Sequence, residues 1–554
     1  MKNRKLRKWM TAGAIITFTT CLITACGKHK EEVTKEPTPT KAEQESESTK
    51  EETTQNETQM EDMKVMDLKE LEACFEGFQS NQPIKNILNN NPLMTQRLGA
   101  DPYAIQYDGR VYIYMTGDVV EYDATGAVKD NSYSKINKIN VISSADLVNW
   151  TDHGSIFAAG ASGASKWGNN SWAPAAAVKE VNGETKFFLY FANGGNGIGV
   201  LTSDSPTGPF TDPLGHALIS RQTPNCGNVA WLFDPAVLVD DDGSAYLYFG
   251  GGVPNEQYAA PGTGRAVQLG DDMISIIGEP VALDIPYLFE DSGINKIGDT
   301  YYYSYCSNFN VSEEATKSLG FATGEIVTMT SKSPLGPFTL QGPILKNPGS
   351  YFGCYGNNHH CVFQFKDKYY IAYHTQMLES RLGISGGYRS TNINEVTVNE
   401  DGSINMVQAN EAGVAQVDTL NPYESVPAET MATMAGISTV PCDEESIACG
   451  SGNMAVNEID TGDWIAVKGV DFGTAGAKRF SIDTKLGETK GAIQIRLDNL
   501  YGEVIGYVPI PTGDTQEFIT LSTDLLTTVT GEHDLFFLFY GSGYELDSWQ
   551  FSKD

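Results

Sequence analysis

The most regularly placed acidic residues of this sequence stand at the beginning of a hairpin that recurs five times. The five hairpins begin at Asp101, Ala173, Asp234, Glu290 and His359. Three of these five residues are carboxylic acids at one position of the repeat. Carboxyl groups crowded into one site push their pKa values apart, so that one stays protonated while another is ionised. The spacing therefore predicts a site that holds a general acid and a general base at neutral pH.

The repeat is visible in the segments between these residues. Thr202–Thr211 and Thr330–Thr339 are nearly identical and lie 128 residues apart, and each hairpin has alternating apolar residues around a turn such as Asp242-Gly243. Five such units of roughly 56–71 residues, with no competing helical period, predict an all-β fold with a five-bladed β-propeller over about residues 92–418. A β-helix is the alternative, although its repeats are normally much shorter.

In a propeller, the innermost strand of each blade lines the central axis, so residues at one repeat position converge there. Taken alone, each acid is more simply explained as a turn residue, because Asp-Pro and Asp-Gly are common turn signals. A purely structural role does not explain why three acids share an axial position, where their charges repel. The joint alignment favours the catalytic interpretation.

The charge of the chain restricts its partners. Among 554 residues there are 38 Lys and Arg but 70 Asp and Glu, which gives a formal net charge of -32. So acidic a protein repels phosphate backbones and anionic lipids, which argues against nucleic acid as a partner. We expect any membrane contact to come from an anchor.

The amino terminus has the pattern of a targeting signal. A basic start and a short apolar stretch end in Leu22-Ile-Thr-Ala-Cys26, which resembles a bacterial lipobox. Residues 1–25 are therefore expected to be a lipoprotein signal peptide and Cys26 the lipidated residue, with an ordinary secretory signal as the alternative. Residues 26–63 are polar and predict a disordered tether, followed by a lead-in segment, 64–91. These features place the protein on the extracellular face of a bacterial cell membrane.

Residues 92–418 resemble glycoside hydrolase family 43. The motifs that carry the resemblance are Gly99–Pro102, Ser171–Pro174, Phe233–Ala236, Phe289–Ser292 and Asn357–His360. Within the family the chain is most similar to the arabinoxylan arabinofuranohydrolases, through Asn91–Leu93, Ile142–Asp146, Val148–Thr151, Phe187–Asn193 and Gly387–Ser390.

This resemblance implies an inverting glycoside hydrolase that removes α-L-arabinofuranosyl side chains from arabinoxylan. Asp101 would be the general base that activates water, Glu290 the general acid, and Asp234 the residue that orients Glu290 and keeps its pKa raised. A β-xylosidase or an endo-arabinanase is an alternative within the fold. A non-catalytic surface glycan-binding lipoprotein is the alternative outside enzymes, and the intact acids argue against it.

The resemblance also implies a calcium ion on the propeller axis, supported by His359 and held mostly through waters. The alternative is a core histidine, and the sequence leaves open whether His359 or His360 faces the axis. Trp172, Asn358 and Arg389 are the candidate substrate-binding residues. A structural role is the alternative for each of them.

After residue 421 the repeat ends, and alternating strands over 421–554 predict a β-sandwich jelly roll. This part resembles family 6 carbohydrate-binding modules. Such modules often hold a structural calcium, for which Glu429 and Asp547 are the candidates, although Pro427 replaces the first residue of the usual Glu-Ala-Glu pattern. Three aromatic residues could form a sugar platform or simply fill the core: Trp464, Tyr544 and Trp549.

Seven cysteines follow Cys26, so at least one of them is free or pairs between chains. Cys442 and Cys449 are the pair that we expect to form a disulfide.

Overall fold

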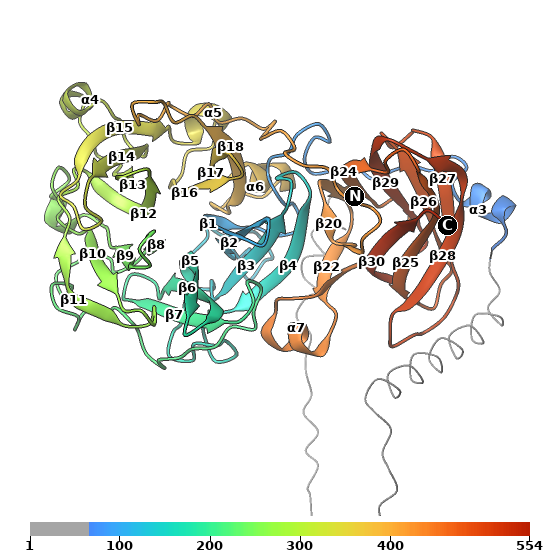
Figure 1. Cartoon of the computed structure of the whole chain (residues 1–554), viewed down its shortest axis with the longest axis horizontal. Helices are drawn as coiled ribbons and strands as arrows, with labels where there is room; N and C mark the ends of the chain where they lie inside the picture. The colour runs from blue at the N-terminus through green and yellow to red at the C-terminus, as the bar shows by residue number, and fades with distance from the viewer. Residues whose placement is uncertain (1–65) are drawn as a thin grey trace, which may run out of the picture. The chain divides into compact units, whose positions relative to one another are not determined.

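Five antiparallel sheets follow one another around a central axis in the computed structural model, which describes residues 66–554 (Figure 1). The first blade contains β1 (Ala100–Tyr107), β2 (Arg110–Thr116), β3 (Lys138–Ser144) and β4 (Trp150–Phe157). The second contains β5 (Trp172–Val181), β6 (Glu184–Ala192) and β7 (Ile198–Ser203). The third contains β8 (Ala236–Val239), β9 (Ala245–Phe249), β10 (Arg265–Leu269) and β11 (Ile276–Ala282). The fourth contains β12 (Leu288–Ile297), β13 (Thr300–Ser307), β14 (Ile326–Ser331) and β15 (Thr339–Leu345), and the fifth β16 (His360–Phe365), β17 (Lys368–Thr375) and β18 (Ser390–Val396).

The ring closes because the innermost strands contact one another in the order β1, β5, β8, β12, β16 and back to β1. The segment before β1 also runs along β18 of the last blade. The Leu93 N–H donates to the Thr391 carbonyl at 2.9 Å, and the Gly99 N–H donates to the Arg389 carbonyl at 3.0 Å. The predicted five-bladed propeller is therefore confirmed, and its two chain ends are joined by backbone hydrogen bonds.

The predicted β-sandwich is also confirmed. One sheet has the order β22 (Ser438–Pro441), β23 (Met454–Asn457), β30 (Glu545–Ser552), β25 (Ala477–Lys485) and β28 (Ile519–Val529), with β19 (Val426–Pro427) beside β30. The other has the order β21 (Thr433–Ala435), β24 (Trp464–Asp471), β29 (Glu532–Tyr540), β26 (Gly491–Leu497) and β27 (Val504–Ile510). Alternate residues of these strands fill one apolar core between the sheets.

The sandwich is attached to the propeller by strand pairing. β20 (Thr430–Met431) adds to β4 as a fifth strand of the first blade. A buried carboxylate reinforces the contact, because Asp152 of β4 accepts hydrogen bonds from Thr439 and, at 3.0 Å, from Gln96. The sandwich therefore covers an edge of the propeller that would otherwise be unpaired.

The helices of the described chain are short. They are α3 (Leu68–Cys74), α4 (Glu313–Leu319), α5 (Gly349–Phe352), α6 (Met377–Leu382) and α7 (Glu444–Cys449), with the 3-10 turn η1 (Pro254–Glu256). No helix within residues 66–554 is long and apolar enough to cross a membrane.

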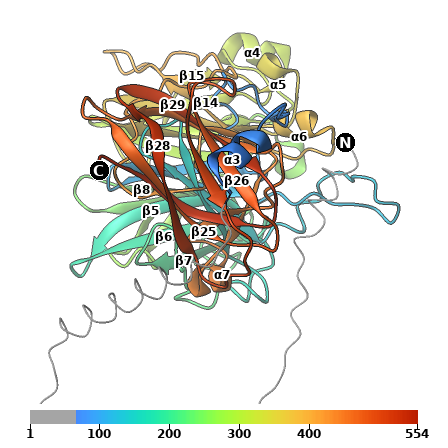
Figure 2. The same ribbon diagram turned by 90° about the vertical axis from the view of Figure 1, so that its right-hand side faces the viewer.

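Helix α3 begins at a capping box formed by Asp67 and Glu70. Leu71 of α3 and Phe75 beyond it pack with Trp464 and Tyr507 of the sandwich. The helix lies beside the sandwich (Figure 2). The lead-in segment thus carries a short helix that packs on the sandwich. The predicted signal peptide, Cys26 and the tether lie outside the described residues.

The predicted disulfide between Cys442 and Cys449 is wrong. All seven cysteines of the described part are free. Cys449 ends α7 with its thiol 3.0 Å from the Ser451 carbonyl, whereas the Cys442 thiol lies 3.5 Å from Asp547. The two side chains therefore point to different partners.

Candidate active site

The innermost strands of the first four blades begin with the same unusual backbone conformation. Asp101, Ala173, Asp234 and Asp291 have φ angles of 48°, 35°, 49° and 72°. Positive φ is uncommon for residues other than glycine and costs about 1–3 kcal/mol. Three blades therefore hold a carboxylate in a strained conformation at the same end of the propeller, which we call the mouth.

This backbone register corrects one part of the predicted alignment. The fourth equivalent residue is Asp291 rather than Glu290, because β12 contains register shifts on both sides of Glu290. The fifth equivalent is His360, whose N–H donates to Asp291 at 3.2 Å just as the Asp291 N–H donates to Asp234 at 2.9 Å. Glu290 and His359 each lie one residue earlier and still belong to the mouth.

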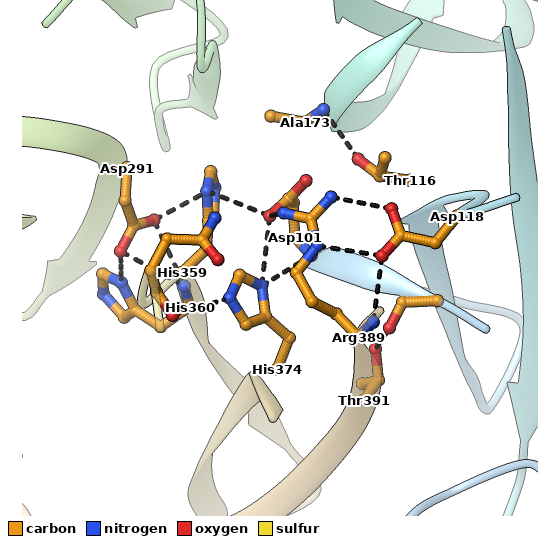
Figure 3. Close-up of polar contacts among 12 residues, drawn as sticks. Asp101, Thr116, Asp118, Ala173, Asp291, His359, His360, His374, Arg389 and Thr391 are labelled. Atoms are coloured by element: carbon orange, nitrogen blue, oxygen red, sulfur yellow. Dashed lines mark hydrogen bonds and ion pairs between the residues drawn. The ribbon is translucent and has the colours of Figure 1, made fainter. Parts of the chain in front are cut away.

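Asp101 is surrounded by nitrogen groups (Figure 3). Its Oδ1 atom lies 2.9 Å from Arg389 Nη1, 3.1 Å from His374 Nδ1 and 3.5 Å from His359 Nδ1. Burial opposes ionisation, but Arg389 and the two histidines outweigh it and hold the pKa of Asp101 below its ordinary value. All three contacts end on Oδ1, so Oδ2 is the oxygen that can accept a proton from water.

Arg389 is fixed by a second carboxylate. Asp118, at the end of β2, accepts bonds from Arg389 Nε at 3.0 Å, Nη2 at 2.8 Å and the backbone N–H at 2.9 Å (Figure 3). The guanidinium also lies over the ring of Tyr133, 5.1 Å from its centroid. Such a two-bond pair sets the orientation of the guanidinium, so Arg389 has one remaining edge directed at Asp101.

The pKa values of Glu290 and Asp234 are shifted upward, in the opposite direction from that of Asp101. Burial raises the pKa of Glu290 well above its ordinary value, and the charges of Asp234 and Asp101 raise it further. Burial and the charge of Asp101 also raise the pKa of Asp234. However, Asp234 accepts the Asp291 N–H, which favours its ionised form, whereas Glu290 Oε1 has no hydrogen-bond partner among the described residues. These contacts favour Glu290 over Asp234 as the group that carries a proton.

The structure distinguishes the two adjacent histidines. His359 faces the axis, with Nδ1 3.5 Å from Asp101 and 3.8 Å from Asp234, while its Nε2 lies 3.1 Å from Asp291. His360 points away from the axis, with Nδ1 2.5 Å from Asp291 and Nε2 2.7 Å from Ser304. Burial lowers the pKa of His359, which favours its neutral form.

The donors around His359 fit a hydrated cation better than a directly bound one. Calcium prefers about six to eight oxygen ligands. No group of three or more His, Cys, Asp or Glu side chains within residues 66–554 could hold a metal ion directly. Nδ1 of His359 nevertheless faces two carboxylates, and Asp291 fixes Nε2 in the way that a carboxylate orients a metal-binding histidine. Water would have to supply most ligands.

The other predicted substrate residues have different environments. Trp172 is half-buried at the mouth, where its indole N–H donates to the Tyr133 carbonyl at 3.0 Å and the two rings meet edge to face. Asn358 is fully buried and donates to the Gly324 carbonyl at 3.0 Å, while its Oδ1 atom has no hydrogen-bond partner in the described chain. The geometry therefore favours a wall role for Trp172.

Aromatic residues of the sandwich do not form the proposed platform. Trp464, Tyr544 and Trp549 are buried in its apolar clusters. Glu429 is also buried, and its Oε2 atom has no hydrogen-bond partner in the described chain. Burial raises the pKa of Glu429, and the charges of Asp152 and Asp547 add to this effect. An unpartnered carboxylate oxygen near a second carboxylate fits a cation site.

Sequence reasoning missed Asp118, His374 and Tyr133. Asp118 and His374 stand at or beyond the ends of β2 and β17. The second strand of a blade runs antiparallel to the first, so its end returns to the mouth where β1 begins. A polar residue at the end of the second strand of a blade is therefore a sequence signal for a site residue at the mouth.

Comparison with known proteins agrees with this geometry. The family model described as "Glycosyl hydrolases family 43" matches residues 89–404, and "Carbohydrate binding module (family 6)" matches residues 427–553. The chain belongs to glycosyl hydrolase family 43, and it is a glycoside hydrolase with a carbohydrate-binding module. The predicted family, fold class and enzyme class are confirmed.

Two arabinoxylan arabinofuranohydrolases are close relatives. The protein from Paenibacillus polymyxa is 50% identical over 494 residues, which cover 86% of this chain and 76% of the relative. The protein from Bacillus subtilis strain 168 is 50% identical over 491 residues, which cover 85% and 93%. A crystal structure of a Bacillus subtilis arabinoxylan arabinofuranohydrolase in complex with cellotetraose superposes with a TM-score of 0.81, at 48% identity over 85% of this chain and 99% of that chain.

Proposed function

We propose that this protein removes α-L-arabinofuranosyl side chains from arabinoxylan and inverts the anomeric carbon. The observation that carries the proposal is the division of labour among buried carboxyl groups at one mouth. Asp101 is kept ionised by Arg389, and Glu290 is kept protonated by burial and by Asp234. The names of the close relatives support the substrate.

The reaction is a single displacement. Asp101 Oδ2 takes a proton from a water molecule, whose oxygen attacks C1 of the arabinofuranosyl unit. Glu290 gives its proton to the glycosidic oxygen as the C1–O bond breaks, and the xylose hydroxyl of the main chain leaves. Room for the water requires the two carboxyl groups to be roughly 6.5–9.5 Å apart. Asp234 helps to raise the pKa of Glu290 and so to keep the proton there before the reaction.

Product analysis tests the substrate. The purified protein is incubated side by side with arabinoxylan, arabinan and an aryl xyloside. Arabinose from arabinoxylan is the expected product, whereas xylose from the xyloside would indicate a β-xylosidase and oligosaccharides from arabinan an endo-arabinanase. Sugar binding without any product would indicate a non-catalytic protein. Proton NMR of the first-formed arabinose should show the inverted anomer.

Calcium at two places is part of the proposal. His359 with waters would hold one ion, which would add positive charge beside Asp101, and Glu429 with Asp547 would hold a second in the module. A chelator should lower the melting temperature of the wild type, and calcium should restore it. Glu429→Gln should remove the part of this shift that belongs to the module. An identical melting temperature with chelator and with calcium would contradict both sites.

We also propose that the enzyme is lipid-anchored through Cys26 on the extracellular face of the membrane. The lipobox-like sequence and the polar segment after it support this localisation. Labelled palmitate should be incorporated into the wild type in the membrane fraction and not into Cys26→Ala. A wild-type protein that is unlabelled and secreted would contradict the anchor.

A further inference from the structure

A small cavity lies where the lead-in segment, the first blade and the carbohydrate-binding module meet. It is lined by Lys85, by the segment before β1, by β3 and β4, and by residues 431–434 of the module. At this junction β20 pairs with β4, with Met431 opposite Trp150 (Figure 1). Most of the lining residues are apolar, and the cavity has room for a group about the size of a water molecule or a small ion.

Three buried polar side chains of this cavity come from different parts of the chain. Lys85 belongs to the lead-in segment, Trp150 begins β4 and Thr433 begins β21, and none of them is more than 3% exposed. The indole nitrogen of Trp150 and the hydroxyl of Thr433 have no hydrogen-bond partner among the residues that the structure describes. A buried polar group without a partner is costly, so these two groups point to a ligand that accepts hydrogen bonds.

Lys85 brings a positive charge to the cavity. Its ammonium group donates to the Pro92 carbonyl at 2.9 Å and to the Asn90 carbonyl at 3.2 Å, which uses two of its three N–H groups. Burial lowers the pKa of Lys85 to about 7, with a contribution from the positive charges of Lys468 and Arg381. A buried cation whose contacts are carbonyls rather than a carboxylate favours a bound counterion.

Asp152 also lines the cavity, but its charge is already balanced by Arg97. Both of its oxygens are occupied, because they accept hydrogen bonds from the Gly154 N–H at 2.9 Å, from Gln96 at 3.0 Å and from Thr439 at 2.6 Å. The groups left for a ligand are therefore donors: an ammonium N–H, an indole N–H and a hydroxyl.

We propose that this cavity binds one chloride ion, held by Lys85, Trp150 and Thr433. A chloride ion matches the single charge of Lys85, whereas a water molecule would leave that charge uncompensated. A phosphate or a carboxylate is too large for the cavity. Because its three donors belong to the lead-in segment, the propeller and the module, the ion stabilises the junction of these parts. The inference does not depend on the substrate of the enzyme.

Thermal unfolding in two salts tests the site. The full chain is measured in sodium chloride and, at the same ionic strength, in sodium methanesulfonate, whose anion is too large for the cavity. Chloride should raise the melting temperature of the wild type by about 2 °C or more, because a ligand of the folded state stabilises it by mass action. Lys85→Met should lose this chloride-dependent shift. Trp150→Phe and Thr433→Val each remove one donor and keep most of the side-chain shape, so they should reduce the shift, and they decide the matter if Lys85→Met does not fold.

Two matched variants serve as controls and should keep the full chloride-dependent shift. Lys368→Met removes an ammonium that pairs with Glu395 at 2.8 Å on the exposed surface. Trp167→Phe removes an indole N–H that already donates to Asp212 at 2.8 Å. A shift that persists in all three cavity variants would overturn the inference, since the ion would then bind elsewhere.

Crystals grown in bromide locate the ion directly. The inference expects an anomalous peak within hydrogen-bonding distance of Lys85 Nζ, Trp150 Nε1 and Thr433 Oγ1. A water molecule in place of bromide would overturn it. A bromide peak without any chloride-dependent shift in melting temperature would overturn it as well, because that result would mean binding at crystal concentration only.

Discussion

Arg389 stands between two carboxylates that have different tasks. Asp101 faces the reacting groups, whereas the side chain of Asp118 is completely buried and serves to hold the guanidinium. Asp118→Asn would leave Arg389 paired with Asp101 but would weaken the charge-assisted hydrogen bonds to position 118, which contribute about 1.5–3 kcal/mol each. We therefore expect Asp118→Asn to lower the free energy of unfolding by about 1.5–3 kcal/mol, together with kcat, as measured by urea unfolding and steady-state kinetics.

Asp524→Asn is the matched control, because Asp524 pairs with Arg479 at 3.1 Å on the exposed surface of the module. Exposed pairs contribute only about 0–1 kcal/mol. Equal destabilisation by the two substitutions would contradict a positioning role for Asp118.

The pKa values of the acid and the base predict the pH dependence of kcat/KM. Asp101 must be ionised, and its lowered pKa keeps it so well into acidic solution. Glu290 must be protonated, and its raised pKa keeps it so toward neutral pH. The rate should therefore fall only when acid protonates Asp101 or when base deprotonates Glu290, which leaves a broad plateau. A narrow optimum near the ordinary carboxyl values, at about pH 4, would show that neither group is perturbed.

At the scale of elements, the contact between β4 and the sandwich rests on a glycine. Gly154 has a φ of 81°, and a methyl group there would lie 2.5 Å from the Gly450 carbonyl of the module. Gly183 has a similar φ of 84° in a hairpin turn, with nothing within 4 Å. Both alanine variants suffer backbone strain, but only Gly154→Ala also suffers overpacking, which typically costs about 1–3 kcal/mol.

Gly154→Ala should therefore be less stable than Gly183→Ala by about 1–3 kcal/mol in urea unfolding. Equal stabilities would mean that the propeller and the module do not approach as closely as the strand pairing indicates.

At the scale of the whole molecule, the lead-in segment joins the beginning of the described chain to its carboxy-terminal module. Leu71 of α3 is buried against the sandwich, whereas Leu88 is 79% exposed. Truncation of a buried leucine typically costs about 2–5 kcal/mol. Leu71→Ala should thus lower the stability of the module by about that amount in thermal unfolding, while Leu88→Ala should leave it nearly unchanged. Equal melting temperatures would show that α3 is not docked in solution.

Much of this architecture was predictable because the blades of the propeller repeat in the sequence. Copies such as Thr202–Thr211 and Thr330–Thr339 identify blades without any knowledge of contacts. The repeat also brought Asp101 and Asp234 to one register. It misplaced Glu290 by one residue, because the register shifts in β12 leave no mark in the sequence pattern. It also placed His359 at the register that His360 occupies.

Features that depend on packing between distant segments were less predictable. Asp118 meets Arg389 only after the first and last blades close, across 271 residues. From the sequence alone, Trp464 and Trp549 could belong either to an exposed sugar platform or to the core. Both side chains are buried, because α3 and the second sheet of the sandwich pack against them. Side-chain burial follows from the whole fold rather than from local spacing.

The central claim is that Glu290 supplies a proton to the leaving oxygen while Asp101 activates the water. It is tested most directly by measuring kcat/KM of Glu290→Gln on arabinoxylan and on 2,4-dinitrophenyl α-L-arabinofuranoside, whose leaving group needs no proton. We expect a loss of about 10²–10⁴-fold on arabinoxylan and a far smaller loss on the dinitrophenyl substrate, whereas Asp101→Asn should lose activity on both. Equal losses of Glu290→Gln on the two substrates would contradict the account.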